Sequence, residues 1–206
     1  MEVRLTQKIY IIDGDFAESG HGSILADIIR HYNPHTDIHC LTNIDHCSSE
    51  TVTKININLH YVLANCTSND ILFTPWNILK SLDSNNLSET DDLFKQISQK
   101  CFRVICTAGN RSDTQPELWT PASLTTHCDV IHAMRKTGAV ADFATHNSHT
   151  LGMYGTNVTC PDGEVRSGSS ISAAIYCGII SRNSDQRFLR RVTRLISKKY
   201  LRELGL

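Results

Sequence analysis

The segment KIYII at 8–12, followed directly by Asp13, determines how the rest of the chain is interpreted. It is short, apolar and rich in β-branched residues, and it stops at a turn, which is typical of a buried strand. A helix is expected next over 21–32, where apolar residues recur at helical spacing until Pro34. The chain therefore opens with a strand, a short turn and a helix.

The alternation of strand and helix continues along the chain. We expect strands at 37–42, 70–74 and 102–107, helices at 50–66, 88–101, 168–180 and 185–204, and a looser β-rich stretch at 128–160. Because the strands are continuous apolar runs, they predict an α/β fold with a mainly parallel central sheet and helices on both faces. A length of 206 residues favours one domain, 1–206.

Composition and charge restrict the possible functions. The 20 Lys and Arg residues nearly balance the 21 Asp and Glu residues, so no nucleic-acid partner is expected. The 185–204 helix is basic and amphipathic; we favour packing against the sheet over binding to a membrane, nucleic acid or acidic partner. No apolar run is long enough for stable membrane insertion, and no signal peptide is recognisable. We therefore expect a cytoplasmic protein, or one delivered without a classical signal peptide; the oligomeric state stays open.

The cysteines and histidines offer an alternative that we considered and disfavour. None of the eight cysteines form a C-x-x-C pair, so we expect reduced thiols. A zinc site could be assembled from His46 with Cys47, or His127 with Cys128, but zinc ligands usually show regular spacing. We expect no metal and no cofactor.

Four polar residues fall where strands end and helices begin: Asp13, His21, Asn110 and Ser170. In a parallel sheet these positions gather at one edge. A serine hydroxyl needs a base to become a nucleophile, histidine is the usual base, and a carboxylate fixes its tautomer. An asparagine amide can stabilise the oxyanion. Asp15 is the competing acid, but Asp13 directly follows the strand.

The segments around these residues resemble the motifs of the subtilisin-like serine peptidases, the subtilase family. The aspartate motif is YIIDGD, the histidine motif HGSILADII (21–29), the asparagine motif VICTAGN and the serine motif GSSIS (168–172). The resemblance covers about 8–182 and implies a subtilisin-like three-layer architecture. It also implies a serine endopeptidase that acts on proteins or peptides through an acyl-enzyme, with Ser170, rather than Ser169, as the nucleophile.

The resemblance further implies a substrate-binding groove at Thr74, Trp76, Thr107, Ala108 and Gly109. The chain departs from the family here, because ILFTPWN replaces S-L-G and Trp76 is expected to crowd the groove. Only eight positions separate Asp13 from His21, which removes the calcium-binding insertion that the family often carries. These departures, with the small size, leave open a catalytically degenerate fold retained for binding or scaffolding.

Overall fold

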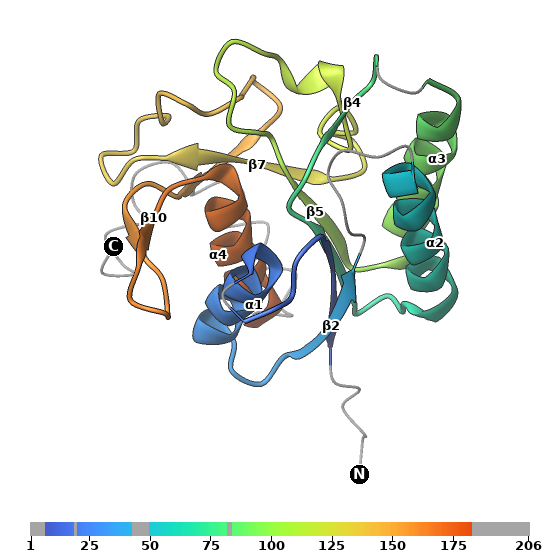
Figure 1. The fold of residues 1–206 in the computed structure, drawn as a ribbon, viewed down its shortest axis with the longest axis horizontal. Helices are drawn as coiled ribbons and strands as arrows, with labels where there is room; N and C mark the ends of the chain where they lie inside the picture. The colour runs from blue at the N-terminus through green and yellow to red at the C-terminus, as the bar shows by residue number, and fades with distance from the viewer. Residues whose placement is uncertain (1–6, 19, 43–49, 82–83, 183–206) are drawn as a thin grey trace.

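A six-stranded parallel sheet forms the centre of the protein (Figure 1). The computed structural model describes residues 7–18, 20–42, 50–81 and 84–182. The strand order is β2-β1-β3-β5-β7-β8, and every neighbouring pair is parallel. The strands are β1 (Lys8–Asp13), β2 (Asp37–Thr42), β3 (Ile71–Thr74), β5 (Arg103–Thr107), β7 (Asp129–Met134) and β8 (Leu151–Tyr154). The predicted α/β class with a parallel sheet is confirmed.

Helices cover both faces of this sheet. The helices α1 (His21–Tyr32) and α4 (Ser169–Arg182) lie on one face, and α2 (Glu50–Asn65) and α3 (Ser84–Lys100) lie on the other (Figure 1). Side chains alternate between the faces of a strand. Ile9 and Ile11 therefore join the core under α1 and α4, whereas Tyr10 and Ile12 join the core under α2 and α3.

The helices α1 and α4 pack closely against each other. Nearly all of α4 is buried, which explains its apolar sequence on every side. A Cβ atom on Gly178 would lie 2.8 Å from Tyr32 Cβ and 3.0 Å from the Ile29 carbonyl oxygen. Only glycine therefore permits this approach of α4 to α1. The two helices lie side by side, and they begin at His21 and Ser169.

Short strands complete the fold. β4 (Ile78–Leu79) pairs antiparallel with β6 (Trp119–Thr120), which follows the 3₁₀ helix η1 (Pro116–Leu118). β9 (Val158–Thr159) pairs antiparallel with β10 (Val165–Arg166). The β-rich stretch expected at 128–160 thus contains β7, β8 and β9.

The helix expected over 88–101 begins earlier, at Ser84. The SETD sequence at 88–91 resembles a helix start because Ser and Thr cap helices well. In the structure the hydroxyl of Thr90 instead donates to Asn56 Oδ1 of α2 at 2.7 Å. Thr90 therefore does not cap the start of α3. Its side chain connects α3 to α2 instead.

Several predictions concern residues that the structure does not describe or that it places elsewhere. The 185–204 helix, His46 and Cys47 lie outside the described residues. The seven described cysteines form no disulfide, and the described residues contain no group of three possible metal ligands. His127, which was considered as a zinc ligand together with Cys128, has its Nδ1 atom 3.2 Å from the hydroxyl oxygen of Ser98. Within the described ranges, no helix is long and apolar enough to span a membrane.

Candidate active site

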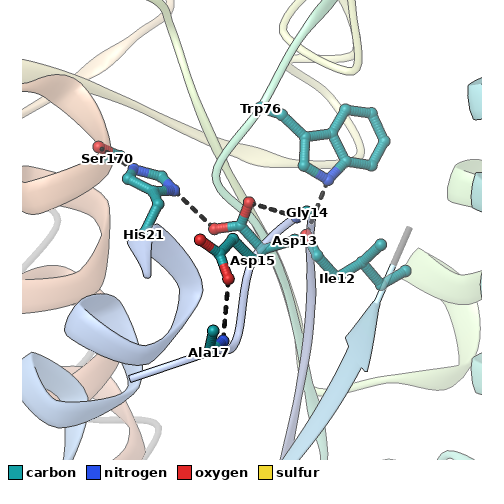
Figure 2. A network of polar contacts seen from close by, with 8 residues as sticks. All are labelled: Ile12, Asp13, Gly14, Asp15, Ala17, His21, Trp76 and Ser170. Atoms are coloured by element: carbon teal, nitrogen blue, oxygen red, sulfur yellow. Dashed lines mark hydrogen bonds and ion pairs between the residues drawn. The ribbon is translucent and has the colours of Figure 1, made fainter. Parts of the chain in front are cut away.

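The end of β1 places Asp13 beside the first residue of α1. Asp13 Oδ2 lies 2.6 Å from His21 Nδ1, and Oδ1 accepts a hydrogen bond from the Gly14 amide at 2.6 Å (Figure 2). The Asp13 side chain is 1% exposed, whereas that of His21 is 47% exposed. An ionised carboxylate can only accept hydrogen bonds, so Nδ1 carries the proton. In the neutral form of the ring, the lone pair therefore lies on Nε2, the nitrogen that faces away from Asp13.

Ser170 lies on the other side of the imidazole. It is the second residue of α4, and its Oγ is 3.1 Å from His21 Nε2. The N–H groups in the first turn of a helix have no partner within the helix, and the helix dipole makes this end positive. The hydroxyl therefore has a base within hydrogen-bond distance and lies where a developing negative charge is stabilised.

Asp15 makes a local contact instead. Its Oδ1 accepts a hydrogen bond from the Ala17 amide at 2.9 Å, and its carboxylate lies in the turn that leads into α1 (Figure 2). A Cβ atom on Gly20 would lie 2.5 Å from the Asp15 carboxylate, so a larger residue at 20 would displace the Asp15 side chain. Of the two acids weighed from the sequence, Asp13 is the one that contacts the His21 ring.

Asn110 follows the end of β5, and its side chain contacts the first residue of α4. Its Oδ1 accepts hydrogen bonds from both the amide and the hydroxyl of Ser169, each at 2.8 Å. Because a backbone amide can only donate, the orientation of the Asn110 side chain is fixed. A Cβ atom on Gly168 would lie 3.7 Å from Asn110 Nδ2 and 3.5 Å from Ser170 Oγ. The Nδ2 group and the hydroxyl therefore border the same small space.

Thr145 holds the backbone on both sides of Asn110. Its amide donates to the Gly109 carbonyl at 3.1 Å, its hydroxyl donates to the Arg111 carbonyl at 2.7 Å, and the same oxygen accepts from the Arg111 amide at 3.0 Å. Gly109 has φ of 113° and a Cβ there would lie 3.0 Å from Thr145 Oγ1. Both backbone conformation and contact thus favour glycine at 109.

The loop that carries Thr145 is anchored by a buried histidine. His132 Nδ1 lies 2.9 Å from the Thr150 hydroxyl, and the His132 and His146 rings are 5.7 Å apart. Burial, and then the neighbouring His146, lower the pKa of His132 to about 4. His132 is therefore neutral at pH 7, and its contact with Thr150 is a hydrogen bond between uncharged groups.

A cavity of about 260 Å³ opens directly beside Ser170. The residues that line it come from the ends of β3 and β5, from β6, from the Thr145 loop and from the starts of α1 and α4: His21, Pro75, Trp76, Asn77, Thr107, Gly109, Asn110, Arg111, Trp119, Thr145, Ser169 and Ser170. Of the predicted groove residues, Trp76, Thr107 and Gly109 are in this lining. The side chains of Thr74 and Ala108 are buried in the sheet and do not line the cavity.

Trp76 forms part of the cavity wall and leaves the cavity open. Its Nε1 donates to the Ile12 carbonyl at 2.7 Å (Figure 2). Its ring packs against Phe94 in the core under α2 and α3. Sequence reasoning missed Asn77, which donates through Nδ2 to Thr107 and accepts through Oδ1 from the Ala122 amide. It also missed Thr145, Trp119 and Arg111, which no motif marks as neighbours of Ser170.

The sequence matches no protein-family model and no curated protein. Solved structures give clear matches. A cold-adapted subtilisin-like serine proteinase superposes with a TM-score of 0.67 at 15% identity, over 89% of this chain and 75% of that one. This chain has a subtilisin-like fold. The nisin leader peptidase NisP from Lactococcus lactis matches with a TM-score of 0.70 at 10% identity, over 85% and 76% of the chains. The MycP3 protease of a type VII secretion system matches at 0.65 and 14% identity, over 93% and 74%.

The subtilisin-like fold was expected from the four sequence motifs. At sequence identities of 10–15%, these matches show a shared fold and do not assign a role to any residue. The roles of individual residues rest on the geometry of this chain.

Proposed function

We propose that the protein is a serine endopeptidase with Asp13, His21 and Ser170 as its catalytic residues. One observation carries the proposal: a continuous chain of contacts from the buried Asp13 carboxylate through both nitrogens of His21 to the Ser170 hydroxyl. Nucleophile, base and orienting acid each lie within hydrogen-bond distance of the next, which is the arrangement that acyl transfer requires.

The reaction begins when Ser170 Oγ attacks the carbonyl carbon of the scissile peptide bond. His21 Nε2 takes the hydroxyl proton, and Asp13 stabilises the imidazolium that forms. The tetrahedral intermediate collapses, the C–N bond breaks, and His21 returns the proton to the leaving amine. Water then attacks the acyl ester with His21 again as the base, which releases the carboxylic acid and restores the Ser170 hydroxyl.

The oxyanion is stabilised by Asn110 Nδ2 and the Ser170 backbone N–H. Asn110 is suited to this role because Oδ1 is fully used by Ser169, which leaves Nδ2 beside the hydroxyl. The Ser170 N–H belongs to the first turn of α4. Donors that are already oriented before the reaction lower the barrier without a cost in reorganisation.

Peptides are the proposed substrates. Two of the proteins with a similar fold are a lanthipeptide protease and a macrocyclase solved with a peptide, with TM-scores of 0.66 and 0.59. The cavity beside Ser170 is open and of a size to take one substrate side chain.

The proposal is tested by incubating the purified protein with a library of proteome-derived peptides and sequencing the new termini. Wild type should generate new termini, and Ser170→Ala should generate none above background. Ser167→Ala, which removes a nearby hydroxyl bonded to the Asn157 amide, is the matched control and should retain cleavage. If wild type and Ser170→Ala give the same peptides, the peptidase proposal is wrong and the degenerate alternative is favoured.

Asn110→Ala should lower kcat by about 10²–10³-fold with a smaller change in KM, because the oxyanion exists only along the reaction path. The substitution also removes the Oδ1 contacts with Ser169, so circular dichroism of the variant must match that of wild type. A change in KM alone, with kcat preserved, would contradict the oxyanion role.

A further inference from the structure

The side chains that line the cavity beside Ser170 differ in whether their polar groups are already used. The Asn77 amide, the hydroxyls of Thr107 and Thr145, and Trp76 Nε1 all make hydrogen bonds within the protein. The Ser169 hydroxyl donates to Asn110. The polar groups of these residues are therefore already hydrogen-bonded within the protein. A bound side chain would meet these groups and the indole surface of the cavity wall.

Arg111 differs from these residues. Its backbone is fully engaged, because the amide donates to Thr145 and the carbonyl accepts from Thr145 and Thr114. Its guanidinium makes no hydrogen bond to any residue that the structure describes. The nearest acid is Asp113, whose Oδ1 lies 3.7 Å from Arg111 Nε, beyond hydrogen-bond distance. The five N–H donors of the guanidinium thus remain available to a ligand.

Within the described chain, the lining of the cavity carries no acidic side chain, although Asp113 lies beside Arg111. The nearby Glu117 is held outside by a contact between its Oε1 and Asn147 Nδ2. Asp13 is buried behind His21 and paired with it. Arg111, which is always protonated, is therefore the one lining residue with a permanent charge.

The reaction geometry orients the substrate relative to this cation. The leaving amine must lie on the His21 side, because His21 delivers its proton. The residue that contributes the scissile carbonyl then extends past Asn110 toward the other end of the cavity. Arg111, which follows Asn110 directly in the chain, and Trp119 of β6 both line the cavity that this residue enters.

We propose that this cavity selects an acidic side chain on the residue that contributes the scissile carbonyl, with the Arg111 guanidinium binding its carboxylate. The inference rests on the proposed peptidase function and adds its substrate class. The methylene groups of a glutamate pack on indole surface, and a charged hydrogen bond to the guanidinium is stronger than a neutral one. A lysine at the same position faces the positive charge of Arg111, and no acidic residue is among the described lining residues.

The test uses four peptides that differ only at this residue, which is Glu, Gln, Leu or Lys. Because the Arg111 side chain is 64% exposed, screening by water limits the effect. We expect kcat/KM for Glu to exceed that for Gln by about three- to tenfold, and Lys to be the poorest substrate. The Glu-to-Gln ratio should fall with added salt. Glu on the other side of the bond should give no preference.

Variants assign the preference to one side chain. Arg111→Gln should bring the Glu-to-Gln ratio to about one, and Arg111→Glu should favour Lys over Glu. Asp113→Asn should raise the Glu-to-Gln ratio, because it removes the competing carboxylate. Lys95→Gln, on α3 and paired with Asp92, makes the same change in net charge away from the cavity and should leave the ratio unchanged.

Three results would overturn the inference. Equal cleavage of the Glu and Gln peptides by wild type would refute it and leave the peptidase function intact. A preference for Glu that persists in Arg111→Gln would show that another group binds the carboxylate. Hydrolysis of none of the four peptides, nor of the proteome-derived library, would refute the proposed function and this inference together.

Discussion

His21→Ala is expected to lower kcat by about 10⁶-fold, close to the loss for Ser170→Ala. Without the imidazole, no base lies within hydrogen-bond distance of the Ser170 hydroxyl, and no acid protonates the leaving amine. The double variant should be no slower than either single variant, because the two residues act as one unit. Steady-state kinetics on a peptide identified from the library would measure all three.

His31→Ala is the matched control for this prediction. His31 lies on the same helix, α1, and its ring contacts Tyr32 rather than the site. Its removal should leave kcat within a few-fold of wild type. If His21→Ala retained a tenth of wild-type activity, Ser170 would not depend on His21 and the proposed mechanism would be wrong.

Asp13→Asn is expected to lower kcat by about 10⁴-fold with little change in shape. Asparagine is similar in size, and its oxygen can still accept from the Gly14 amide. Its NH₂ group then points at His21 Nδ1 and donates to it, so the ring proton moves to Nε2. The nitrogen that faces Ser170 loses its lone pair and can no longer take a proton from the hydroxyl.

Asp15→Asn provides the comparison, because the Asp15 carboxylate accepts from the nearby Ala17 amide and no hydrogen bond joins it to the His21 ring among the described residues. It should cost less than tenfold in kcat. Equal losses for the two variants would mean that the negative charge near α1 matters rather than the tautomer of His21, which contradicts the mechanism.

The sequence predicts an element most reliably where the hydrophobic pattern of a single segment is enough to form it. KIYII forms β1 because its side chains alternate into two cores, and 21–32 forms α1 because its apolar residues share one face. The turn between them is short, so Asp13 and His21 had to be neighbours. The start of α3 was placed late, because Thr90 forms a tertiary contact that no local pattern shows.

Around Ser170, the contacts that sequence reasoning missed join residues far apart in the chain. Thr145 reaches Arg111 across 34 positions, and Asn77 reaches Thr107 across 30. Neither contact has a period or spacing that could be found in the sequence. Trp76 was expected to crowd the groove. It is 8% exposed and lines the cavity, and its Nε1 donates to the Ile12 carbonyl 64 positions away, a contact that no motif marks.

The central claim is that Asp13 and His21 activate Ser170. It is tested most directly by treating the folded protein with a fluorophosphonate, which reacts with activated serines, and mapping the adduct by mass spectrometry. The account predicts modification of Ser170 in wild type, loss of labelling in His21→Ala and no modification of the adjacent Ser169. Folded protein that stays unlabelled at Ser170, or that labels equally fast without His21, would contradict it.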